Sequence, residues 1–212
     1  MRKDITNIII AVAAVVLCAS HGFARTATDF FTSAPDSVIR LLPQATRLDM
    51  VDYFNFGSTH SSSNAFNGSA MMKAVSDKTM SFQVDKDVTM QLVVLPAKND
   101  TVIALVTTLS TPALDSSIEF YDTDWKCLRR PPFAFPAYNA WLTPEGLGDK
   151  VKVEMYLPFI PVSASFDPEG NTLLLTNEAP FYLDELDYNG LKPLLVATKV
   201  YNVNAGRFIE QK

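Results

Sequence analysis

A short, proline-rich stretch of the sequence, RRPPFAFPAYNAWLTPEG at residues 129–146, carries a group of aromatic side chains. These are Phe133, Phe135, Tyr138 and Trp141. Aromatic side chains are enriched at protein interfaces and on sugar-facing surfaces, and prolines lower the entropy that a segment loses on binding. The spacing therefore predicts a binding surface for a protein or a glycan at residues 131–142. The alternative is that the rings pack over a sheet as a lid, and burial of both Tyr138 and Trp141 would exclude an exposed platform.

A second group of polar residues lies in LLPQATRLDMVDYF, residues 41–54, where one basic residue and two carboxylates stand among large apolar side chains. The capping and burial of a helix account for most of this pattern. Arg47 and Asp52 are the two residues that a helix does not require. We expect them to be structural clamps if they meet polar groups of a sheet, or a polar site if they face an open cleft.

The residue types of the common hydrolases are scarce. His60 is the only histidine after residue 24, and it lies in a loop rich in Ser and Asn. A Ser-His-Asp triad, a Cys-His pair or a histidine-based zinc site would have to use it. Neither a Gly-x-Ser-x-Gly motif nor the local signature of a papain-like cysteine is present. We therefore expect none of these enzyme classes, no metal site and no cofactor.

Carboxylates could still support a hydrolase. Asp122 and Asp124 alternate in YDTDW and would share one face of an extended chain, and three more acids cluster in LDELD at residues 183–187. A glycosidase needs two carboxyl groups that flank a sugar bond, and a calcium site needs several converging oxygens. Nothing in the sequence brings these groups together, so we expect solvated carboxylates. A carboxylate-dependent glycan hydrolase is the alternative, which two acids from distant segments meeting in a cleft would favour.

The composition indicates a folded protein. Hydrophobic residues make up 48% of the 212 residues and aromatic residues 11%, which is enough for a core. The formal net charge is −5 and no long basic run follows the N-terminus, so we do not expect a nucleic-acid partner. Cys127 is the only cysteine beyond residue 24, so no intrachain disulfide can support the fold after removal of those residues.

Residues 1–24 have the pattern of a secretory signal peptide. Arg2 and Lys3 precede an apolar run that is too short to span a bilayer comfortably, since a span needs about 20 residues. Gly22 and Ala24 are the small residues at positions −3 and −1 of a cleavage site. We expect cleavage after Ala24 and no transmembrane segment in the rest of the chain.

The final compartment follows from the same segment. Acylation of Cys18, as in a lipoprotein, is disfavoured because Leu17 stands where the peptidase requires a small residue. We expect an exported protein that is periplasmic, displayed on the cell surface or secreted.

The elements that position these groups are expected to be helical at the start of the mature chain. The segment TSAPDSVIRLL, residues 32–42, predicts a short helix that Ser33 caps and Pro43 interrupts. The segment TRLDMVDYFNFG, residues 46–57, predicts a second helix that stops at Gly57.

The second helix has a predicted orientation as well. Thr46 and Asp49 have the spacing of a capping box at its start. Its apolar residues recur at helical spacing and are expected to face the core, with Arg47 and Asp52 toward the other side. The apolar set is Leu48, Val51, Tyr53 and Phe54.

From Ala70 onward, short apolar runs alternate with turn sequences such as DKD and PAKND. Such short connections favour antiparallel pairing. One strand is expected to turn four side chains to a single face: Val88, Met90, Leu92 and Val94. Strands are expected to resume with KVKVEMYL at residues 150–157, and FYLDELDYNG predicts one or two helical turns. The pattern suggests two meanders joined by the segment 129–146.

A resemblance to a known family rests on three stretches: LLPQATRLDMVDYF, the turn-flanked VVLPAKNDTVIALVTTLSTPALDSSIEFYDTDWKCL, and the closing VYNV. They resemble an uncharacterised family of exported bacterial proteins, the domain of unknown function 3256. The resemblance covers most of the chain after residue 24, and RLDMVDYF with FYDTDW is its most specific part. It implies a secreted or envelope protein with the fold of that family, and it carries no catalytic residue to this chain.

We expect an α+β fold of mainly antiparallel sheet with a short helical N-terminal region, and an all-β sandwich is the alternative. Residues 25–212 would form one domain, or two β subdomains divided near 129–146. The expected function is non-enzymatic binding or an envelope-associated role, with an unknown protein or glycan of the cell envelope as partner. The alternatives are the glycan hydrolase above and a scaffold component that binds a protein through a sheet edge or residues 131–142.

Overall fold

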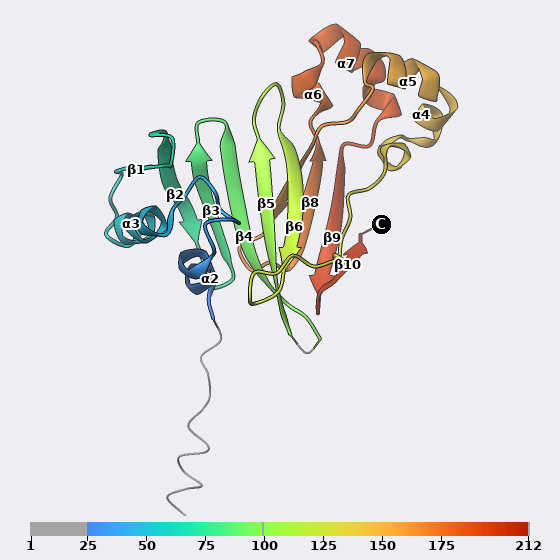
Figure 1. Ribbon diagram of the computed structural model, residues 1–212. Coiled ribbons are helices and arrows are strands. Elements are labelled where there is room, and N and C mark those ends of the chain that lie inside the picture. Colours follow the sequence, from blue (N-terminus) through green and yellow to red (C-terminus); the bar gives the residue numbers. More distant parts are fainter. Residues whose placement is uncertain (1–24, 99, 212) are drawn as a thin grey trace, which may run out of the picture.

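Two antiparallel sheets and a helical cap make up the fold (Figure 1). The computed structural model describes residues 25–98 and 100–211, so the expected signal peptide and Cys18 lie outside the described residues. Six strands form the first sheet in sequence order: β1 (Ser62–Ser63), β2 (Ser69–Val75), β3 (Thr79–Asp85), β4 (Val88–Pro96), β5 (Thr101–Leu109) and β6 (Asp115–Tyr121). Four strands form the second sheet in the order β10-β9-β8-β7: β7 (Val162–Phe166), β8 (Thr172–Asn177), β9 (Thr198–Asn204) and β10 (Arg207–Glu210).

The helices fall into two groups. Before the first sheet come α2 (Ala27–Ser33) and α3 (Gln44–Asn55). The cap stands at one end of the second sheet and is built from two stretches of chain, one before β7 and one between β8 and β9 (Figure 1). It comprises η1 (Tyr138–Trp141), α4 (Pro144–Gly148), α5 (Lys150–Tyr156), α6 (Ala179–Tyr182), α7 (Glu185–Leu191) and η2 (Lys192–Leu194). The predicted α+β class with antiparallel sheets is confirmed.

Both faces of the six-stranded sheet are apolar at its centre. On β4, Leu92 points to one face and Val93 to the other, and on β5 Leu105 and Ala104 repeat this alternation. The predicted common face of β4 is confirmed, because the same cluster contains Val88, Met90, Leu92 and Val94. A sheet that is apolar on both faces needs a cover on each side.

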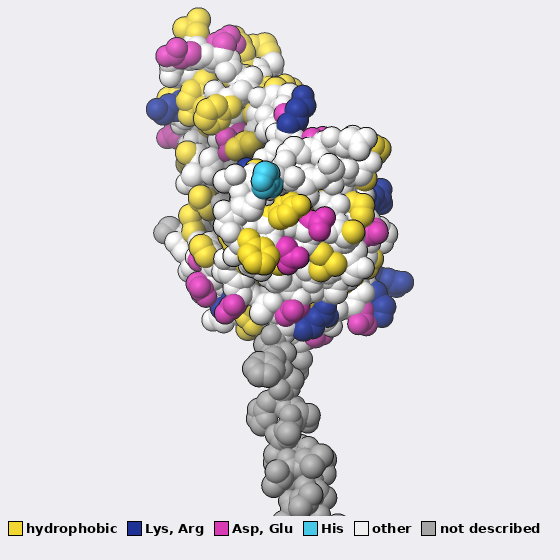
Figure 2. Space-filling view, turned by 90° about the vertical axis from the view of Figure 1, so that its left-hand side faces the viewer, with side chains coloured by type: hydrophobic (Ala, Val, Ile, Leu, Met, Phe, Trp, Pro, Cys, Tyr) yellow, Lys and Arg dark blue, Asp and Glu magenta, His cyan; other side chains and the backbone are white. Residues whose placement is uncertain are grey.

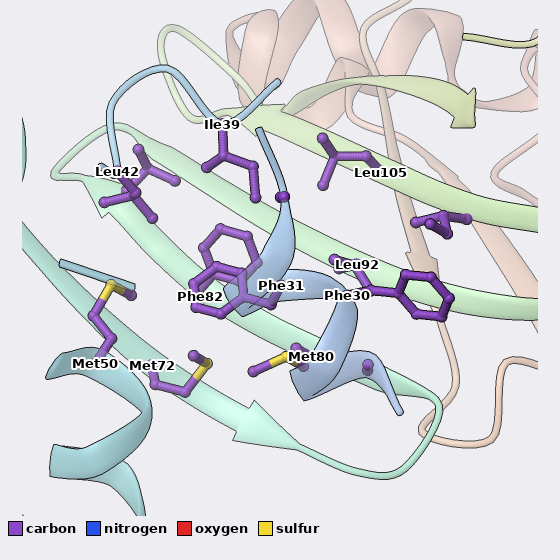
Figure 3. Close-up of a cluster of buried hydrophobic side chains, with 14 of the residues drawn as sticks. Phe30, Phe31, Ile39, Leu42, Met50, Met72, Met80, Phe82, Leu92 and Leu105 are labelled. Atoms are coloured by element: carbon purple, nitrogen blue, oxygen red, sulfur yellow. The ribbon is translucent and has the colours of Figure 1, made fainter. Parts of the chain in front are cut away.

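Helix α2 covers the first face (Figure 3). It inserts Phe30 and Phe31 into the fold, and the ring centroid of Phe31 lies 4.7 Å from that of Phe82 on β3. The segment between α2 and α3, together with α3, completes the cluster with Ile39, Leu42 and Met50. Each fully buried side chain of this size stabilises the fold by about 1.5–3 kcal/mol.

The four-stranded sheet covers the second face. Gln91 on β4 reaches across to Phe166 on β7, where it accepts a hydrogen bond from the backbone N–H at 2.8 Å and donates one to the carbonyl at 2.9 Å. At the edge of the first sheet, the side chains of Asp115 and Ser116 on β6 accept hydrogen bonds from backbone N–H groups of β7 at 3.1 and 3.0 Å. Side chains therefore join the edge strands of the two sheets.

A third apolar cluster holds the cap together. Val153 and Leu157 of the α5 region pack with Leu191 of α7 and Leu194 of η2. Gly146 of α4 lies directly against the Leu194 carbonyl, where a Cβ would come within 2.1 Å of the oxygen. A glycine is therefore required for α4 to approach η2 this closely.

The first predicted helix is wrong in position. Helix α2 spans Ala27–Ser33, so Ser33 is its last residue and not its cap. Thr26 caps α2 instead, in a reciprocal capping box with Asp29. The residues after Ser33 form turns up to Pro43, because the prolines at 35 and 43 leave only a short segment between them.

The second predicted helix exists, with a different start. Helix α3 begins at Gln44, directly after Pro43, and has no side-chain cap. The Thr46 hydroxyl donates a hydrogen bond to the Ser63 carbonyl at 3.1 Å, so the predicted capping box is wrong. The predicted stop agrees with the structure, because Gly57 follows the helix in the left-handed region with φ of 65°.

The predicted buried face of α3 is wrong apart from Val51, which is half-buried and packs against the first cluster. Arg47 is fully buried and Met50 is 2% exposed, whereas Leu48 is 47% exposed and Phe54 is 37% exposed. The helix therefore turns a cation and a methionine toward the core. Apolar periodicity predicted the wrong face because it contains no information on the buried carbonyls of the preceding segment, which need hydrogen-bond donors from α3.

The predicted strand at residues 150–157 is wrong, because Lys150–Tyr156 form α5. The preceding helix α4 has a start signal of its own, because the Thr143 side chain caps it and Pro144 occupies its first position, whereas α5 has no side-chain cap. The apolar residues whose alternation suggested a strand point in different directions in the helix, some to the core and some to solvent. Val153 is buried, whereas Val151 is 82% exposed.

Arg47 ties the segment between α2 and α3 to the core. Its guanidinium donates hydrogen bonds to the carbonyls of Ala34 and Leu42, and it pairs with Asp36 at 3.0 Å. Both carbonyls belong to the segment that carries Ile39 and Leu42 into the first cluster. Buried carbonyls need such donors, because an unpaired one costs about 1–3 kcal/mol.

Replacement of Arg47 by Ala should lower the free energy of unfolding by about 3–5 kcal/mol, because two buried carbonyls lose their donor. Urea denaturation followed by circular dichroism measures the change. Asp52→Ala is the matched control on the same helix; its side chain is exposed, and the change should stay within about 0.5 kcal/mol. A loss of less than about 1 kcal/mol for Arg47→Ala would show that the guanidinium does not hold this segment.

Candidate functional site

The four aromatic residues of the proline-rich segment do not share one environment. Phe133 is 9% exposed, and its ring lies 5.2 Å from Tyr201 and 4.9 Å from Phe208, within the cluster between the sheets. Trp141, on η1, is 2% exposed. Phe135 and Tyr138 are half-buried. The segment is therefore largely a lid over the second sheet, with Phe135 and Tyr138 reaching its outer side.

A pocket of about 320 Å³ opens where this lid meets the cap. Its lining is mainly aromatic, aliphatic and proline side chains: Phe135, Pro136, Tyr138, Trp141, Pro158, Phe159, Ile160 and Val162, with Asp115 and Ser116 of β6. Phe159 is 48% exposed and is the most open ring of the set. Three of the four aromatic residues predicted from the sequence thus line one pocket, and Phe159 joins them from beyond α5.

The hydroxyl groups of this aromatic pocket are already engaged. Tyr138 donates a hydrogen bond to the Leu157 carbonyl at 2.8 Å. Ser116 accepts one from β7 and shares another with the Thr108 hydroxyl at 2.8 Å. Asp115 uses one carboxylate oxygen to accept from the Val162 N–H at 3.1 Å. A ligand would therefore meet chiefly ring faces and aliphatic carbon.

Two lysines lie near the rings. The ammonium of Lys150 is 5.9 Å from the centre of the Tyr138 ring, and that of Lys199 is 6.0 Å from the centre of the Trp141 ring. Lys199 also pairs with Glu210 at 2.6 Å. These distances are at the outer limit of a cation–π contact, so the lysines add a weak positive potential to the aromatic pocket.

Burial changes the acidity of the tyrosines in this region. Burial raises the pKa of Tyr138, and the carboxylate of Glu154 raises it further. Burial also raises the pKa of Tyr201 to about 12, with additional effects of the charge and hydrogen bond of Glu210. Both hydroxyls therefore stay protonated at any physiological pH and serve as donors.

Arg47 and Asp52 do not form one site. Arg47 is fully buried in the N-terminal part of the fold, where it binds carbonyls of the segment after α2. Asp52 lies one and a half turns further along α3 with an exposed side chain. Neither residue lines the aromatic pocket.

The remaining candidate residues of the sequence have structural partners or face solvent. Asp122 accepts hydrogen bonds from the N–H groups of Asp124 and Lys126 at 2.9 Å each, and so shapes a turn. Asp184 caps α7. Cys127 is exposed. Within residues 25–98 and 100–211, no group of three or more His, Cys, Asp or Glu side chains is placed to hold a metal ion.

The face of the molecule that carries α3 is mixed in character. Figure 2 shows hydrophobic and acidic side chains next to one another on this face. The His60 ring lies 6.4 Å from that of Tyr53. Single apolar residues of this kind are normal on a surface and indicate no site by themselves.

A larger pocket, of about 470 Å³, lies beside α2. Its lining combines Arg25, Asp77 and Lys78 with apolar residues of β4 and α2. The Arg25 guanidinium stacks 4.1 Å from the centre of the Phe30 ring and donates to the Thr123 carbonyl at 3.3 Å. Its cation is thus already bound within the fold. No local pattern pointed to this pocket, because its residues come from four distant segments of the chain.

The sheet edges differ in how far they are covered. The edge strands β6 and β7 lie against each other and are joined by side chains. On the opposite side of the first sheet, the two-residue β1 pairs only with the start of β2, and Lys73 stands exposed further along β2. A charge on an edge strand opposes pairing with another chain.

The stability of the fold should fall with rising pH from about pH 10 to about pH 12. Tyrosines of the unfolded chain lose their protons near pH 10, whereas folded Tyr201 keeps its proton up to about 12, so the unfolded state binds fewer protons in this window. Urea denaturation at pH 9 to 12 measures the slope. Tyr201→Phe and Tyr138→Phe should each flatten it. Slopes in both variants equal to that of the unchanged chain would contradict this origin.

Comparison with known proteins supports the fold and leaves the activity open. The family model described as "Protein of unknown function (DUF3256)" matches residues 19–208, which confirms the family expected from the sequence. A solved structure titled "Structure of a domain of an uncharacterized protein from Porphyromonas gingivalis W83" is similar, with a TM-score of 0.74 and 24% identity over 89% of this chain and 99% of that one. At this identity the likeness concerns the fold alone. No match was found among curated proteins.

Proposed function

We propose that this chain, which belongs to the family of proteins of unknown function DUF3256, is an exported, non-enzymatic binding module. It holds an apolar side chain of a protein partner in the aromatic pocket. The observation that carries this proposal is the pocket itself, about 320 Å³ lined by rings and prolines with Phe159 half-exposed at its rim. Pockets of this size and lining are typical of binding sites.

A protein side chain suits the aromatic pocket better than a sugar does. A glycan buries hydroxyl groups that each need a hydrogen-bond partner, and such groups are costly when unpaired. The hydroxyls of Ser116 and Tyr138 are bound to the protein itself, and Asp115 offers one further oxygen. An aliphatic or aromatic side chain needs no such partner, and burial of its apolar area supplies the binding energy.

The same lining argues for binding without turnover. Hydrolysis of a glycan needs two carboxyl groups that face the same bond, about 5–10 Å apart. Among the residues that line the aromatic pocket, Asp115 is the one acid, and it accepts a hydrogen bond from β7. The pocket can bind and orient a ligand, and it offers no pair of acid and base.

Export is part of the proposal and rests on the N-terminal sequence. The basic start, the apolar run and the small residues before Arg25 are those of a cleaved signal. Cleavage after Ala24 would leave every described helix and strand intact, since Thr26 is the first residue with a capping role. Among the described residues, no helix has the length and apolar character needed to cross a bilayer.

Expression of the whole chain in a bacterial host, followed by fractionation and N-terminal sequencing, tests export. We expect a protein outside the cytoplasm that begins at Arg25. Replacement of Ala24 by Leu, which is too large for the −1 position, should leave the precursor uncut. A cytoplasmic protein that retains Met1, or a protein with a lipid on Cys18, would contradict the proposal.

Small analogues of side chains test the aromatic pocket. N-acetyl-phenylalaninamide and N-acetyl-leucinamide should shift the NMR signals of residues around Phe135, Tyr138 and Phe159, with a Kd on the order of 1 mM, as expected for ligands of this size. N-acetyl-alaninamide should not. Phe159→Ser should weaken binding about tenfold, and Phe66→Ser, a change of a ring that is 80% exposed elsewhere, should have no effect.

Two outcomes would contradict a pocket for a protein side chain. One is that the amides shift no signal of the aromatic pocket, or that their shifts do not depend on Phe159. The other is that maltohexaose or a peptidoglycan fragment shifts the same signals while the amides do not, which would favour a glycan ligand.

A further inference from the structure

The helical cap exposes much of its own apolar surface. Of the sixteen large hydrophobic residues that are exposed among those described, seven lie on the cap. They are Leu147, Val151, Met155, Tyr156, Phe159, Phe181 and Leu186. In Figure 2 the cap rises at the top of the molecule with hydrophobic side chains beside charged ones. Exposed apolar residues gathered on one small unit mark an interaction surface.

Helix α5 presents one half of this surface. Val151 is 82% exposed and stands between Lys150 and Lys152. Lys150 pairs with Glu154 at 3.3 Å, whereas Lys152 is exposed and pairs with no acid among residues 25–98 and 100–211. Met155 lies four residues after Val151 on the same helix and so extends the apolar stripe, and Leu147 is exposed on the neighbouring α4.

Helix α7 presents the other half with the opposite charge. Leu186 is 83% exposed and stands between Glu185 and Asp187. Neither acid forms an ion pair with any residue in the described part of the chain. The sequences Lys-Val-Lys on α5 and Glu-Leu-Asp on α7 are thus complementary: each has an exposed apolar residue between two charges, and the charges are opposite.

The two halves pack on one small apolar core. Val153 of α5 and Leu191 of α7 are buried in the same apolar cluster. The rings of Phe159 and Tyr182 lie 4.9 Å apart and join the end of α5 to α6. Figure 1 shows α5 and α7 together at the end of the molecule, away from the first sheet. Their exposed faces are therefore available to the same partner.

We propose that the cap is a self-association surface whose occupant is a second copy of this chain. In a two-fold symmetric dimer, a residue that contacts another is contacted by it in return, so one surface must carry both partners of each pair. The cap meets this condition, because α5 of one copy can bind α7 of the other, and the contact occurs twice. Each contact sets Lys150 and Lys152 against Glu185 and Asp187, with Val151 against Leu186.

The charge of the cap disfavours a membrane as the occupant. Its helices and their caps carry three lysines, at 150, 152 and 192, and six acids that are not buried: Glu145, Asp149, Glu154, Asp184, Glu185 and Asp187. Anionic lipid attracts clusters of basic residues and repels a surface with an excess of acids. A second copy carries the same excess of acids, and its association depends on the local pairing of the α5 lysines of one copy with the α7 acids of the other.

The contact is small, so the dimer should be weak. Stable interfaces bury about 1,200–2,000 Å² in total, and transient ones lie below that range. We expect a Kd on the order of 10–100 μM that rises with salt concentration, since charge pairs contribute to it. None of the six residues of the Lys-Val-Lys and Glu-Leu-Asp segments lines the aromatic pocket, although Phe159 belongs to both surfaces and Lys150 lies 5.9 Å from the Tyr138 ring. Val151→Asp and Leu186→Asp therefore test the dimer separately from the proposed function, because neither residue touches the pocket.

Charge exchange between two variants of the purified chain tests the dimer by sedimentation equilibrium at about 5–500 μM, a range chosen to bracket the expected Kd. Lys150→Glu with Lys152→Glu should raise the Kd at least tenfold, and so should Glu185→Lys with Asp187→Lys. An equimolar mixture of the two variants should dimerise with a Kd within about threefold of the unchanged chain, because each variant then meets the opposite charge. Circular dichroism checks that both variants fold.

The apolar part of the contact has its own variants. Val151→Asp or Leu186→Asp should abolish the dimer, and Phe66→Asp, far from the cap, should leave its Kd unchanged. A chain that stays monomeric at the highest concentration would overturn the proposal. So would a dimer that charge exchange does not affect, or a mixture that does not restore association. Binding to phosphatidylglycerol vesicles that Val151→Asp abolishes would identify a lipid surface and overturn it as well.

Discussion

The six-stranded sheet imposes the main constraint on this structure, because the strands at its centre are apolar on both faces. On β4, Leu92 and Val93 are both fully buried although they point in opposite directions. Such a sheet cannot face water on either side and must find two covers. The N-terminal helices supply one cover and the second sheet supplies the other. The positions of all other elements follow from this arrangement.

Each cover is fixed by polar contacts as well as by burial. On the helical side, Arg47 binds the carbonyls of Ala34 and Leu42 and so holds the segment between α2 and α3 in place. On the other side, Gln91 exchanges two hydrogen bonds with the backbone of Phe166. These contacts select one arrangement among many that would bury a similar apolar area, because a buried polar group without a partner is costly.

The candidate sites lie on segments outside the two covers of the first sheet, namely the proline-rich segment and the cap. The chain must cross from the first sheet to the second, and the proline-rich segment makes this crossing with Phe133 buried and Phe135 and Tyr138 at the rim of a pocket. The cap completes the end of the second sheet through its own small core, centred on Val153 and Leu191. With so few residues inside, its helices keep large apolar side chains outside, and these remain available to partners.

The sequence by itself determined the class of fold, the antiparallel pairing and the common face of β4, because alternation and turn residues act over a few neighbouring positions. It also pointed to the aromatic segment, through composition alone. Only the tertiary structure decided which face of α3 is buried, since Arg47 points inward to satisfy carbonyls of another segment. It likewise decided that residues 150–156 are helical and that Phe159 joins Tyr138 at one pocket. These outcomes depend on contacts between residues far apart in the chain, and no local pattern contains them.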